Sequence, residues 1–300
     1  MRRDYIDATG VRFDGSGRRV GQAGAAQRLR EEGLAAVLHG GRIISDIVVS
    51  DPNPGRGPLA GFANERALLE SVEAIYSHVR ATLIRERFPL LYGGDCSVLL
   101  GAVPALRDAI GSAGLLFVDA HEDATTMHES TTGEVANMEI ALLLGLTGER
   151  APEPLRTKLP ALQHDTIQML GQRDAKYREQ IGVGSIADRV RLRTAQELRC
   201  DPEGITADAT ARIANKVAGW WLHVDLDVLD GEEFSSCGAA DDRSMPPGLT
   251  WAELTAVTRI ALGSKGCQGW SVGVYNPDLD PDGYDARRIV AYIAEAIEGI

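Results

Sequence analysis

The stretch Gly114-Leu115-Leu116-Phe117-Val118-Asp119-Ala120-His121-Glu122-Asp123 decides which fold we expect for this chain. It begins with a short apolar run, and an acid follows that run directly. Four other short apolar runs end in the same way, at Gly, Asp or Asn-Pro: residues 88–92, 166–170, 220–224 and 269–274. Such runs are typical of strands that are buried on both faces of a parallel sheet. We therefore predict a buried parallel sheet.

Helical patterns lie between and after these apolar runs. They cover residues 64–87, 98–110, 137–146, 250–262 and 285–300. Thr250 and Glu253 have the spacing of a capping box, in which each side chain caps the backbone N–H of the other residue. Strands that alternate with helices indicate a parallel sheet with helices on both faces. The predicted fold class is α/β, a single three-layer α/β/α domain over residues 1–300, with surface loops at 51–58 and from 151 onward.

The composition excludes several classes of protein. The chain has 300 residues and a net charge of -12, and an acidic surface repels nucleic-acid phosphates. No apolar run approaches the roughly 20 residues that a membrane span needs, and the first residues do not read as a signal peptide. The four cysteines are widely spaced, which favours reduced thiols over a disulfide framework. We expect a cytoplasmic protein with no nucleic-acid partner and no membrane.

Acidic residues gather where the predicted strands end. Asp119, His121 and Asp123 stand at alternate positions, so in an extended segment their side chains share one face. His223, Asp225 and Asp227 repeat this spacing at the end of the run 220–224 and directly after it. Converging carboxylates repel one another unless a cation neutralises them. Carboxylates with imidazole suit Mn, Mg, Fe or Zn, and shared carboxylates suggest two ions that could generate a hydroxide nucleophile.

Each piece of this pattern also has an ordinary explanation. A lone Asp-x-His-x-Asp is more often a capped turn or a surface loop, and Asp225-Leu226-Asp227 could open a helix. The pieces together, each directly after an apolar run, favour a metal site. A nucleotide-dependent oxidoreductase is disfavoured, because Gly15-Ser16-Gly17 is only a fragment of the dinucleotide fingerprint.

The motifs in this order resemble those of the arginase/agmatinase (ureohydrolase) family. The similar segments are residues 10–34, 93–97, 119–123, 171–174, 225–230, 247–250 and 276–277. The resemblance covers nearly the whole chain. It implies an arginase-like α/β/α fold, two Mn²⁺ ions per chain, and hydrolysis of a C–N bond in a guanidino or amidino compound by a metal-bridging hydroxide.

The resemblance also implies a role for each ligand. Asp119 and Asp225 would bridge the two ions, while His121 and Asp227 would complete one of them. Asp123 would bind the other ion and move protons as a catalytic residue.

Cys96 stands where the family usually has a His ligand. A thiolate is soft and Mn²⁺ is hard, so one ion would bind weakly or the preferred metal would shift toward Zn or Fe; alternatively, Cys96 is a small buried thiol.

The loop after Asp123 departs from the family pattern. Glu134 and Ala136 stand where the resemblance implies Asn and a proton-transferring His. His128 is a candidate catalytic substitute for that His, although a solvated loop His is more common. Thr132 and Glu134 are the candidate substrate-binding residues of this loop. Glu134 is also a candidate catalytic residue, since a carboxylate that faces a guanidinium forms a charge-assisted hydrogen bond.

Two further departures concern the substrate. Val274 stands where the family normally has a Glu that binds the guanidinium of the substrate. Lys176 stands where arginases have an acid that binds the substrate α-amino group, and Glu179 follows three residues later. Both are candidate substrate-binding residues, although a surface Lys is common. These changes indicate a substrate other than plain arginine, such as N-hydroxyarginine or a formimino amino acid. A non-catalytic metal-binding relative that senses a ligand is the alternative, and the resemblance implies a homo-oligomer, a trimer or hexamer.

Overall fold

The computed structural model describes residues 5–18, 21–38, 40–147, 151–237 and 245–298. Its strands are β1 (Ile6–Arg12), β2 (Arg42–Val48), β3 (Phe88–Tyr92), β4 (Gly114–Val118), β5 (Ile167–Gln172), β6 (Arg191–Thr194), β7 (Trp220–Asp225) and β8 (Cys267–Gly273). Its α-helices are α1 (Ala25–Glu31), α2 (Leu34–Val37), α3 (Glu65–Ile84), α4 (Leu99–Ile110), α5 (Glu139–Leu143), α6 (Glu153–Arg156), α7 (Ala175–Ile181), α8 (Ala195–Cys200), α9 (Pro202–Ala214), α10 (Trp251–Gly263) and α11 (Tyr284–Ala296).

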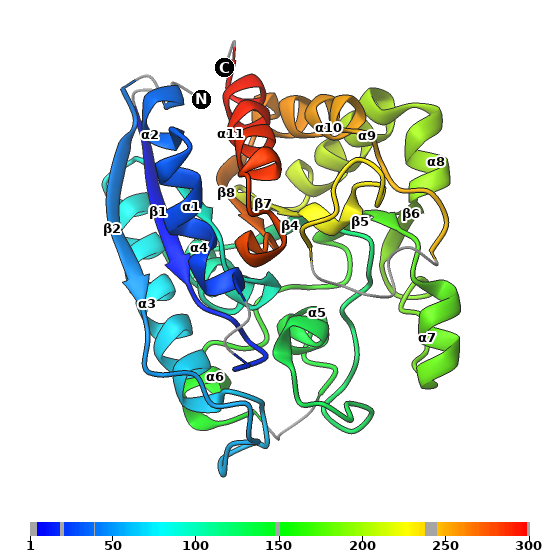
Figure 1. Cartoon of the computed structure of the whole chain (residues 1–300). Coiled ribbons are helices and arrows are strands. Elements are labelled where there is room, and N and C mark those ends of the chain that lie inside the picture. The colour runs from blue at the N-terminus through cyan, green and yellow to red at the C-terminus, as the bar shows by residue number, and fades with distance from the viewer. Residues whose placement is uncertain (1–4, 19–20, 39, 148–150, 238–244, 299–300) are drawn as a thin grey trace.

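All eight of these strands form one parallel sheet, in the order β2-β1-β3-β8-β7-β4-β5-β6. The central strands are buried along their whole length, because helices cover both faces of the sheet. Figure 1 shows α1 beside α11, so helices from the two ends of the chain pack together. This arrangement confirms the predicted fold class, and the single domain over residues 1–300 stays a prediction.

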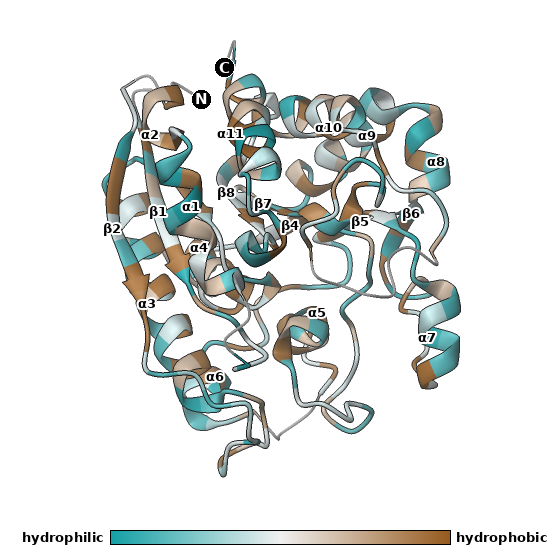
Figure 2. Cartoon of the chain, viewed as in Figure 1, coloured by the Kyte–Doolittle hydropathy of each residue, from teal (hydrophilic) through white to brown (hydrophobic). Residues whose placement is uncertain are grey.

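Two hydrophobic cores lie on opposite faces of the sheet. Residues alternate between them along each strand: Leu116 and Leu222 belong to the core under α1, α9, α10 and α11, whereas Phe117 and Trp221 belong to the core under α3, α4 and α5. Figure 2 shows hydrophobic and hydrophilic stretches in turn along rim helices such as α7 and α8, as expected for helices with one face on solvent.

The strongest apolar runs are predicted well. β3 and β4 match the predicted ranges, while β5, β7 and β8 differ from them by one or two residues at an end. The capping box forms at α10: Thr250 Oγ1 accepts from Glu253 N at 3.2 Å, and Glu253 Oε2 accepts from Thr250 N at 2.8 Å. Strands β1, β2 and β6 and helices α1, α2, α6, α7, α8 and α9 are additions to the prediction.

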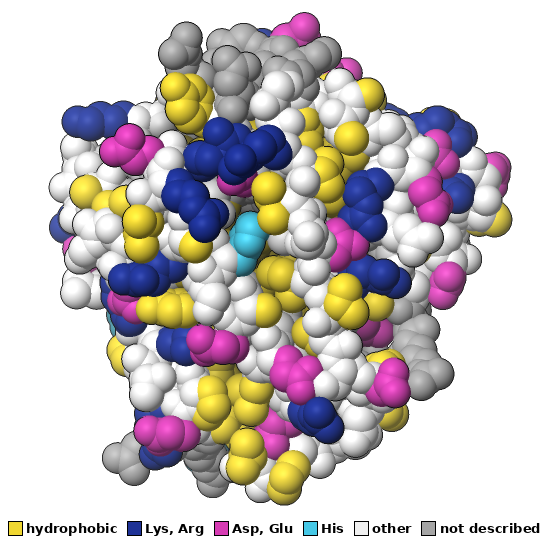
Figure 3. Space-filling model, turned by 90° about the vertical axis from the view of Figure 1, so that its left-hand side faces the viewer, with side chains coloured by type: hydrophobic (Ala, Val, Ile, Leu, Met, Phe, Trp, Pro, Cys, Tyr) yellow, Lys and Arg dark blue, Asp and Glu magenta, His cyan; other side chains and the backbone are white. Residues whose placement is uncertain are grey.

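Membranes and nucleic acids are the two partner classes that the sequence disfavours. Among the described residues, no helix is long and apolar enough to cross a membrane. On the face drawn in Figure 3, basic and acidic side chains are interspersed, and the Lys and Arg side chains form only small groups. A nucleic-acid-binding protein usually carries a continuous basic stripe instead.

Candidate metal centre

The candidate site lies where four neighbouring strands end. β3, β8, β7 and β4 are adjacent and parallel, so their carboxyl ends meet at one edge of the sheet. Asp95 and Cys96 follow β3, Asp119 follows β4, and Asp225 is the last residue of β7. Ligands bind at this edge in open α/β sheets. The fold therefore brings together residues that are more than a hundred positions apart.

Cys96 lies between the two carboxylates that were predicted to bridge the ions. Its Sγ is 2.8 Å from Asp225 Oδ2 and 3.7 Å from Asp119 Oδ2. Cys96 opens the 3-10 helix η3 (Cys96–Val98), which Asp95 caps by accepting a hydrogen bond from Ser97 N. The thiol is buried and contacts the acidic cluster, so Cys96 lies beside the other candidate ligands and not in a remote part of the core.

His121 and Asp227 form the second half of the cluster. His121 Nδ1 lies 2.9 Å from an oxygen of Asp227 and 3.5 Å from Asp119 Oδ1. The Asp227 carboxylate also accepts a hydrogen bond from Ala120 N at 3.2 Å, and Asp227 N donates to Asp225 Oδ1 at 2.8 Å. The bond from Ala120 joins the two acidic motifs, and the bond from Asp227 N orders the Asp225–Asp227 motif itself.

Three groups of side chains could each hold a metal ion. They are Asp119, His121 and Asp227; Cys96, Asp123 and Glu139; and Cys96, Asp119 and His223. Within each group the candidate ligand atoms lie within 4.8 Å of one another. The structure thus brings together all six predicted metal ligands, with Asp225 joined to the groups through Cys96.

Glu139 is a candidate ligand that the sequence analysis misses, and His223 is one whose spacing it notes without naming it a ligand. Both side chains are 0% exposed. His223 Nδ1 contacts Ser271 Oγ at 2.7 Å, while its Nε2 has no hydrogen-bond partner among the described residues. The predicted alternation of His223 with Asp225 agrees with their positions on β7, where residues two apart share one face. The sequence does not indicate a ligand role for Glu139, because this residue stands inside a helical pattern where a Glu is ordinary.

Burial and mutual repulsion shift the pKa values of this cluster. Burial, followed by the charge of Asp227, raises the pKa of Asp119 to about 7. Burial also raises the pKa values of Asp123, Asp225 and Cys96 well above their usual range. Without cations these groups keep their protons, and bound cations would reverse the shifts.

The two imidazoles of the site differ in charge. Burial alone would lower the pKa of His121, but Asp227 and Asp119 raise it well above its ordinary value. Burial lowers the pKa of His223 to about 3, so this ring is neutral at physiological pH. A neutral imidazole is the form that binds metals, and the donor set as a whole fits divalent cations.

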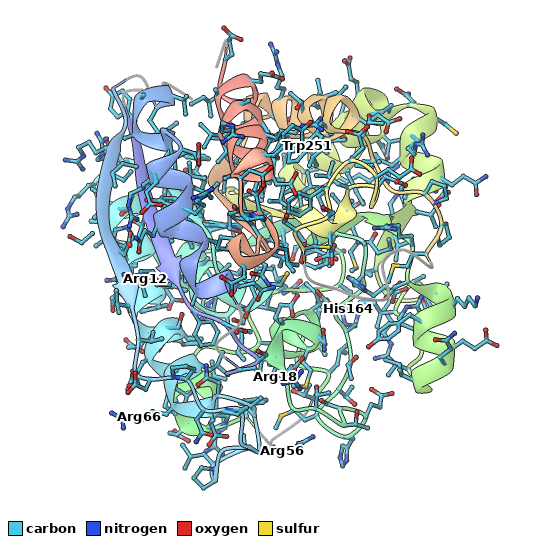
Figure 4. All side chains as sticks on the ribbon, viewed as in Figure 1. Arg12, Arg18, Arg56, Arg66, His164 and Trp251 are labelled. Carbon is cyan, nitrogen blue, oxygen red and sulfur yellow. The ribbon has the colours of Figure 1, made fainter. Side chains whose placement is uncertain are left out.

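A pocket of about 430 Å³ opens above the cluster. The floor of the pocket is lined by Cys96, His121, Asp123, Asp225 and Asp227. Its remaining wall includes Arg18, Thr132, Glu134, Ala136, Tyr177, Arg178 and Val274. Arg18 Nη2 pairs with Glu134 Oε1 at 3.0 Å, and Figure 4 shows Arg18 near α5. The two predicted loop residues, Thr132 and Glu134, therefore reach the pocket.

Three predicted site residues lie elsewhere. His128, Lys176 and Glu179 are exposed and do not line this pocket. Lys176 and Glu179 stand on α7, whose Tyr177 and Arg178 line the pocket in their place. Successive residues of a helix point in different directions, so a one-residue offset decides which side chain reaches the site. The structure gives no support to the roles predicted for these three residues, and those roles stay predictions.

Known proteins share both the sequence pattern and the fold. The model of the arginase family matches residues 6–298. The chain belongs to the arginase family. An arginase from Staphylococcus aureus (strain MRSA252) is 26% identical over 237 residues, which are 78% of this chain and 75% of the relative. Membership in the family confirms the predicted enzyme class, a hydrolase of the ureohydrolase type.

Solved structures confirm that the fold is arginase-like. An arginase from Bacillus caldovelox superimposes with a TM-score of 0.80 at 22% identity and covers 98% of both chains. A formimidoylglutamase from Bacillus subtilis superimposes with a TM-score of 0.72 at 17% identity and covers 98% of this chain and 86% of the other.

This arginase-family chain has an altered pocket wall. Ala136 and Val274 both line the pocket, at the positions where the resemblance implies a His and a Glu. Val274 has a φ of 64°, and Asp123 has a φ of 44°. A positive φ is costly for a β-branched residue and marks sites of functional strain. The wall beside the cluster therefore offers an apolar side chain, held in a strained backbone, in place of an acid.

Proposed function

We propose that this protein is a two-metal amidinohydrolase that cleaves a C–N bond of a guanidino or amidino compound. The observation that carries the proposal is the convergence of six candidate ligands: Cys96, His121, Asp123, Asp225 and Asp227 line one pocket, and the buried Asp119 lies directly behind them, against Cys96 and His121. Two divalent ions bound there would lower the pKa of water and supply a nucleophile at neutral pH. Mn²⁺ is the expected ion, with Zn²⁺ or Fe²⁺ as alternatives because of Cys96.

The residues of the chain divide into ligands and a proton carrier. Asp119 and Asp225 lie on both sides of Cys96, within reach of two ions, while His121 and Asp227 hold one of them. Asp123 would bind the other ion, and it lines the pocket. Its carboxylate therefore lies beside both the proposed nucleophile and the substrate, where it could accept and return protons.

The substrate would lie between the metal ligands and the loop of residues 130–137. Glu134 is the carboxylate of that loop on the pocket wall, and its partner Arg18 is 62% exposed. A cationic guanidinium or amidinium could displace Arg18 from this surface pair and bind Glu134 through charge-assisted hydrogen bonds. Because Val274 replaces an acid on the other wall, a modified guanidine such as N-hydroxyarginine, or a formimino amino acid, fits better than plain arginine.

A substrate screen tests the proposal. The protein, loaded with Mn²⁺ or Zn²⁺, is incubated with arginine, agmatine, N-hydroxyarginine and formimino amino acids. Release of urea, hydroxyurea, formamide or ammonia is then measured. We expect turnover of at least one modified compound at a higher kcat/KM than arginine. A higher kcat/KM for arginine than for every other compound would contradict the substrate assignment.

A ligand sensor is the second candidate. Ala136 and Val274 favour it, because neither side chain can transfer a proton or pair with a guanidinium. A sensor would bind guanidines and keep its metal ions without releasing any product. If no compound in the screen released product while both metal sites were filled, the result would favour the sensor over the enzyme.

We further propose that the protein is a cytoplasmic homo-oligomer, a trimer or hexamer, as its family resemblance implies. Size-exclusion chromatography with light scattering measures the mass directly. A mass of three or six times 32.2 kDa supports the proposal, and a monomer mass contradicts it.

A further inference from the structure

Glu139 is the most unusual buried charge in the described part of the chain. It is the first residue of α5 and is 0% exposed. Neither of its carboxylate oxygens has a hydrogen-bond partner among the described residues. Burying an ionised carboxylate without partners is strongly unfavourable, so such a group is kept only with a proton or a cation.

The backbone holds Glu139 against the metal cluster. Ile140 N donates to the carbonyl oxygen of Asp123 at 3.1 Å, and Thr125 N donates to that of Asn137 at 3.1 Å. These two bonds tie the segment after Asp119 to the start of α5. The position of Glu139 is therefore set by the same loop that carries Asp123.

Glu139 lies at the right range for a shared ion. Its ligand atom, that of Asp123 and the sulfur of Cys96 all lie within 4.8 Å of one another. Ligands at about 2.0–2.3 Å from one ion are separated by at most about 4.6 Å. The three donors therefore need only a slight contraction to surround a single cation.

We propose that Glu139 is a ligand of the ion beside Cys96. This inference rests on the proposed two-metal centre and adds a residue to it. The carboxylate supplies an oxygen donor at the position where a thiol has replaced the imidazole that the resemblance implies. A set of one thiolate with carboxylates favours Zn²⁺ or Fe²⁺ over Mn²⁺ at this position.

The competing explanation is a shared proton. Asp123 and Glu139 are neighbours, and two carboxylates can form a hydrogen bond only when one of them is protonated. In that case Glu139 would be a neutral acid that only packs beside the ligands. The two explanations differ in what happens to metal binding when Glu139 loses its charge and keeps its shape.

The test is the variant Glu139→Gln, which has nearly the same volume. Metal-free protein is titrated with Zn²⁺ in a calorimeter, and bound metal is counted by elemental analysis. We expect the variant to keep one ion with unchanged affinity and to bind the other at least about 100-fold more weakly, because a lost outer-sphere partner alone costs about 10–100-fold. Equal affinities for both ions in variant and wild type would overturn the inference.

The matched control is Glu65→Gln. Glu65 is also a buried glutamate, but it lies at the start of α3 and accepts hydrogen bonds from the backbone N–H groups of Leu59 and Ala60. This variant should bind both ions as the wild type does. If it lost one ion selectively as Glu139→Gln is expected to, the loss would reflect general destabilisation, and the inference would fall.

A crystal structure of the zinc-loaded wild type makes the test independent of any variant that does not fold. We expect a Glu139 oxygen at about 2.0–2.2 Å from the ion beside Cys96. Two bound ions with Glu139 out of contact would overturn this inference alone. A loaded crystal with no ion at the cluster would instead overturn the proposed function.

Discussion

The sulfur of Cys96 lies 2.8 Å from Oδ2 of Asp225, at the point where β3 and β7 end at the same edge of the sheet. Burial raises the pKa values of both groups well above their usual range. The thiol therefore keeps its proton and donates a hydrogen bond to the carboxylate when no cation is present. A divalent ion would replace that proton and bind both groups, so this contact marks the place where metal preference is decided.

The first prediction concerns that preference. Cys96→His replaces a soft donor with the imidazole that the family resemblance implies, and imidazole suits Mn²⁺ better than thiolate does. We expect the affinity for Mn²⁺ to rise by about tenfold, while the affinity for Zn²⁺ changes less. Calorimetric titration of both metals measures the two effects. Cys200→His, at an exposed cysteine, is the control and should change neither affinity; an unchanged Mn²⁺ affinity in Cys96→His would contradict a ligand role for Cys96.

The second prediction concerns the bridging carboxylates. Asp119→Ala and Asp225→Ala each remove an oxygen donor from both ions, so we expect metal content to fall from two ions to less than one. Asp188→Ala is the control, since the Asp188 side chain is 76% exposed and remote from the pocket wall. Elemental analysis after dialysis gives the content. Two ions retained in either bridging variant would show that its carboxylate does not bridge.

The third prediction concerns pH and metal removal. Burial raises the pKa of Asp95 to about 6 and that of Asp119 to about 7, whereas an unfolded Asp titrates near 3.9. The folded state thus holds more protons than the unfolded state between about pH 4 and pH 7. As the pH rises through this window, the metal-free protein therefore loses stability. Its free energy of unfolding falls by about 1.4 kcal/mol per pH unit for each extra proton that the folded state holds.

Urea unfolding of chelator-treated protein at about pH 5 and about pH 7.5 measures this effect. Metal-loaded protein should lose much less stability, since bound cations keep the carboxylates ionised. Asp227 acts in the opposite sense: burial would raise its pKa, but His121 lowers it. The variant Asp119→Asn should flatten the slope of the metal-free protein. A metal-free wild type that becomes more stable with rising pH would contradict the acidic cluster as described.

The fourth prediction concerns substrate binding. Glu134→Gln removes the loop charge that faces the pocket, and a hydrogen bond to a charged group contributes about 1.5–3 kcal/mol. We expect KM for the substrate that the screen identifies to rise by about 10–100-fold, with metal content unchanged. Glu129→Gln is the matched control, because Glu129 also lines the pocket but caps Thr126. An unchanged KM in Glu134→Gln would exclude Glu134 from the substrate site.

The predicted strands have continuous apolar sequences, whereas β1 is buried but contains Asp7, Thr9 and Gly10 and was not predicted. β3 and β4 are buried at every position, so uninterrupted apolar runs reveal them. β2 and β6 are the edge strands, and their sequences contain charged residues such as Arg42, Asp46 and Arg193. A strand with one solvated side lacks a continuous apolar run, and so the same rule missed both.

The site was predicted as far as it follows from strand ends. Asp119, His121, Asp225 and Asp227 stand beside strands whose ends the apolar runs locate. Glu139 reaches the cluster through a long loop and a tertiary contact to Asp123, which no local pattern encodes. Lys176 and Glu179 of α7 do not line the pocket for a different reason, since the resemblance fixed the segment but not which side of the helix faces the pocket.

The proposed chemistry depends on a pair of cations at this edge of the sheet. Elemental analysis of purified protein, loaded separately with Mn²⁺ and Zn²⁺ and then dialysed, tests for that pair without relying on any substrate. We expect close to two ions per chain for at least one of these metals, and fewer than one in Asp119→Ala. A wild-type protein that retains no metal after loading would contradict the proposed metal centre, and only the fold and the family would remain.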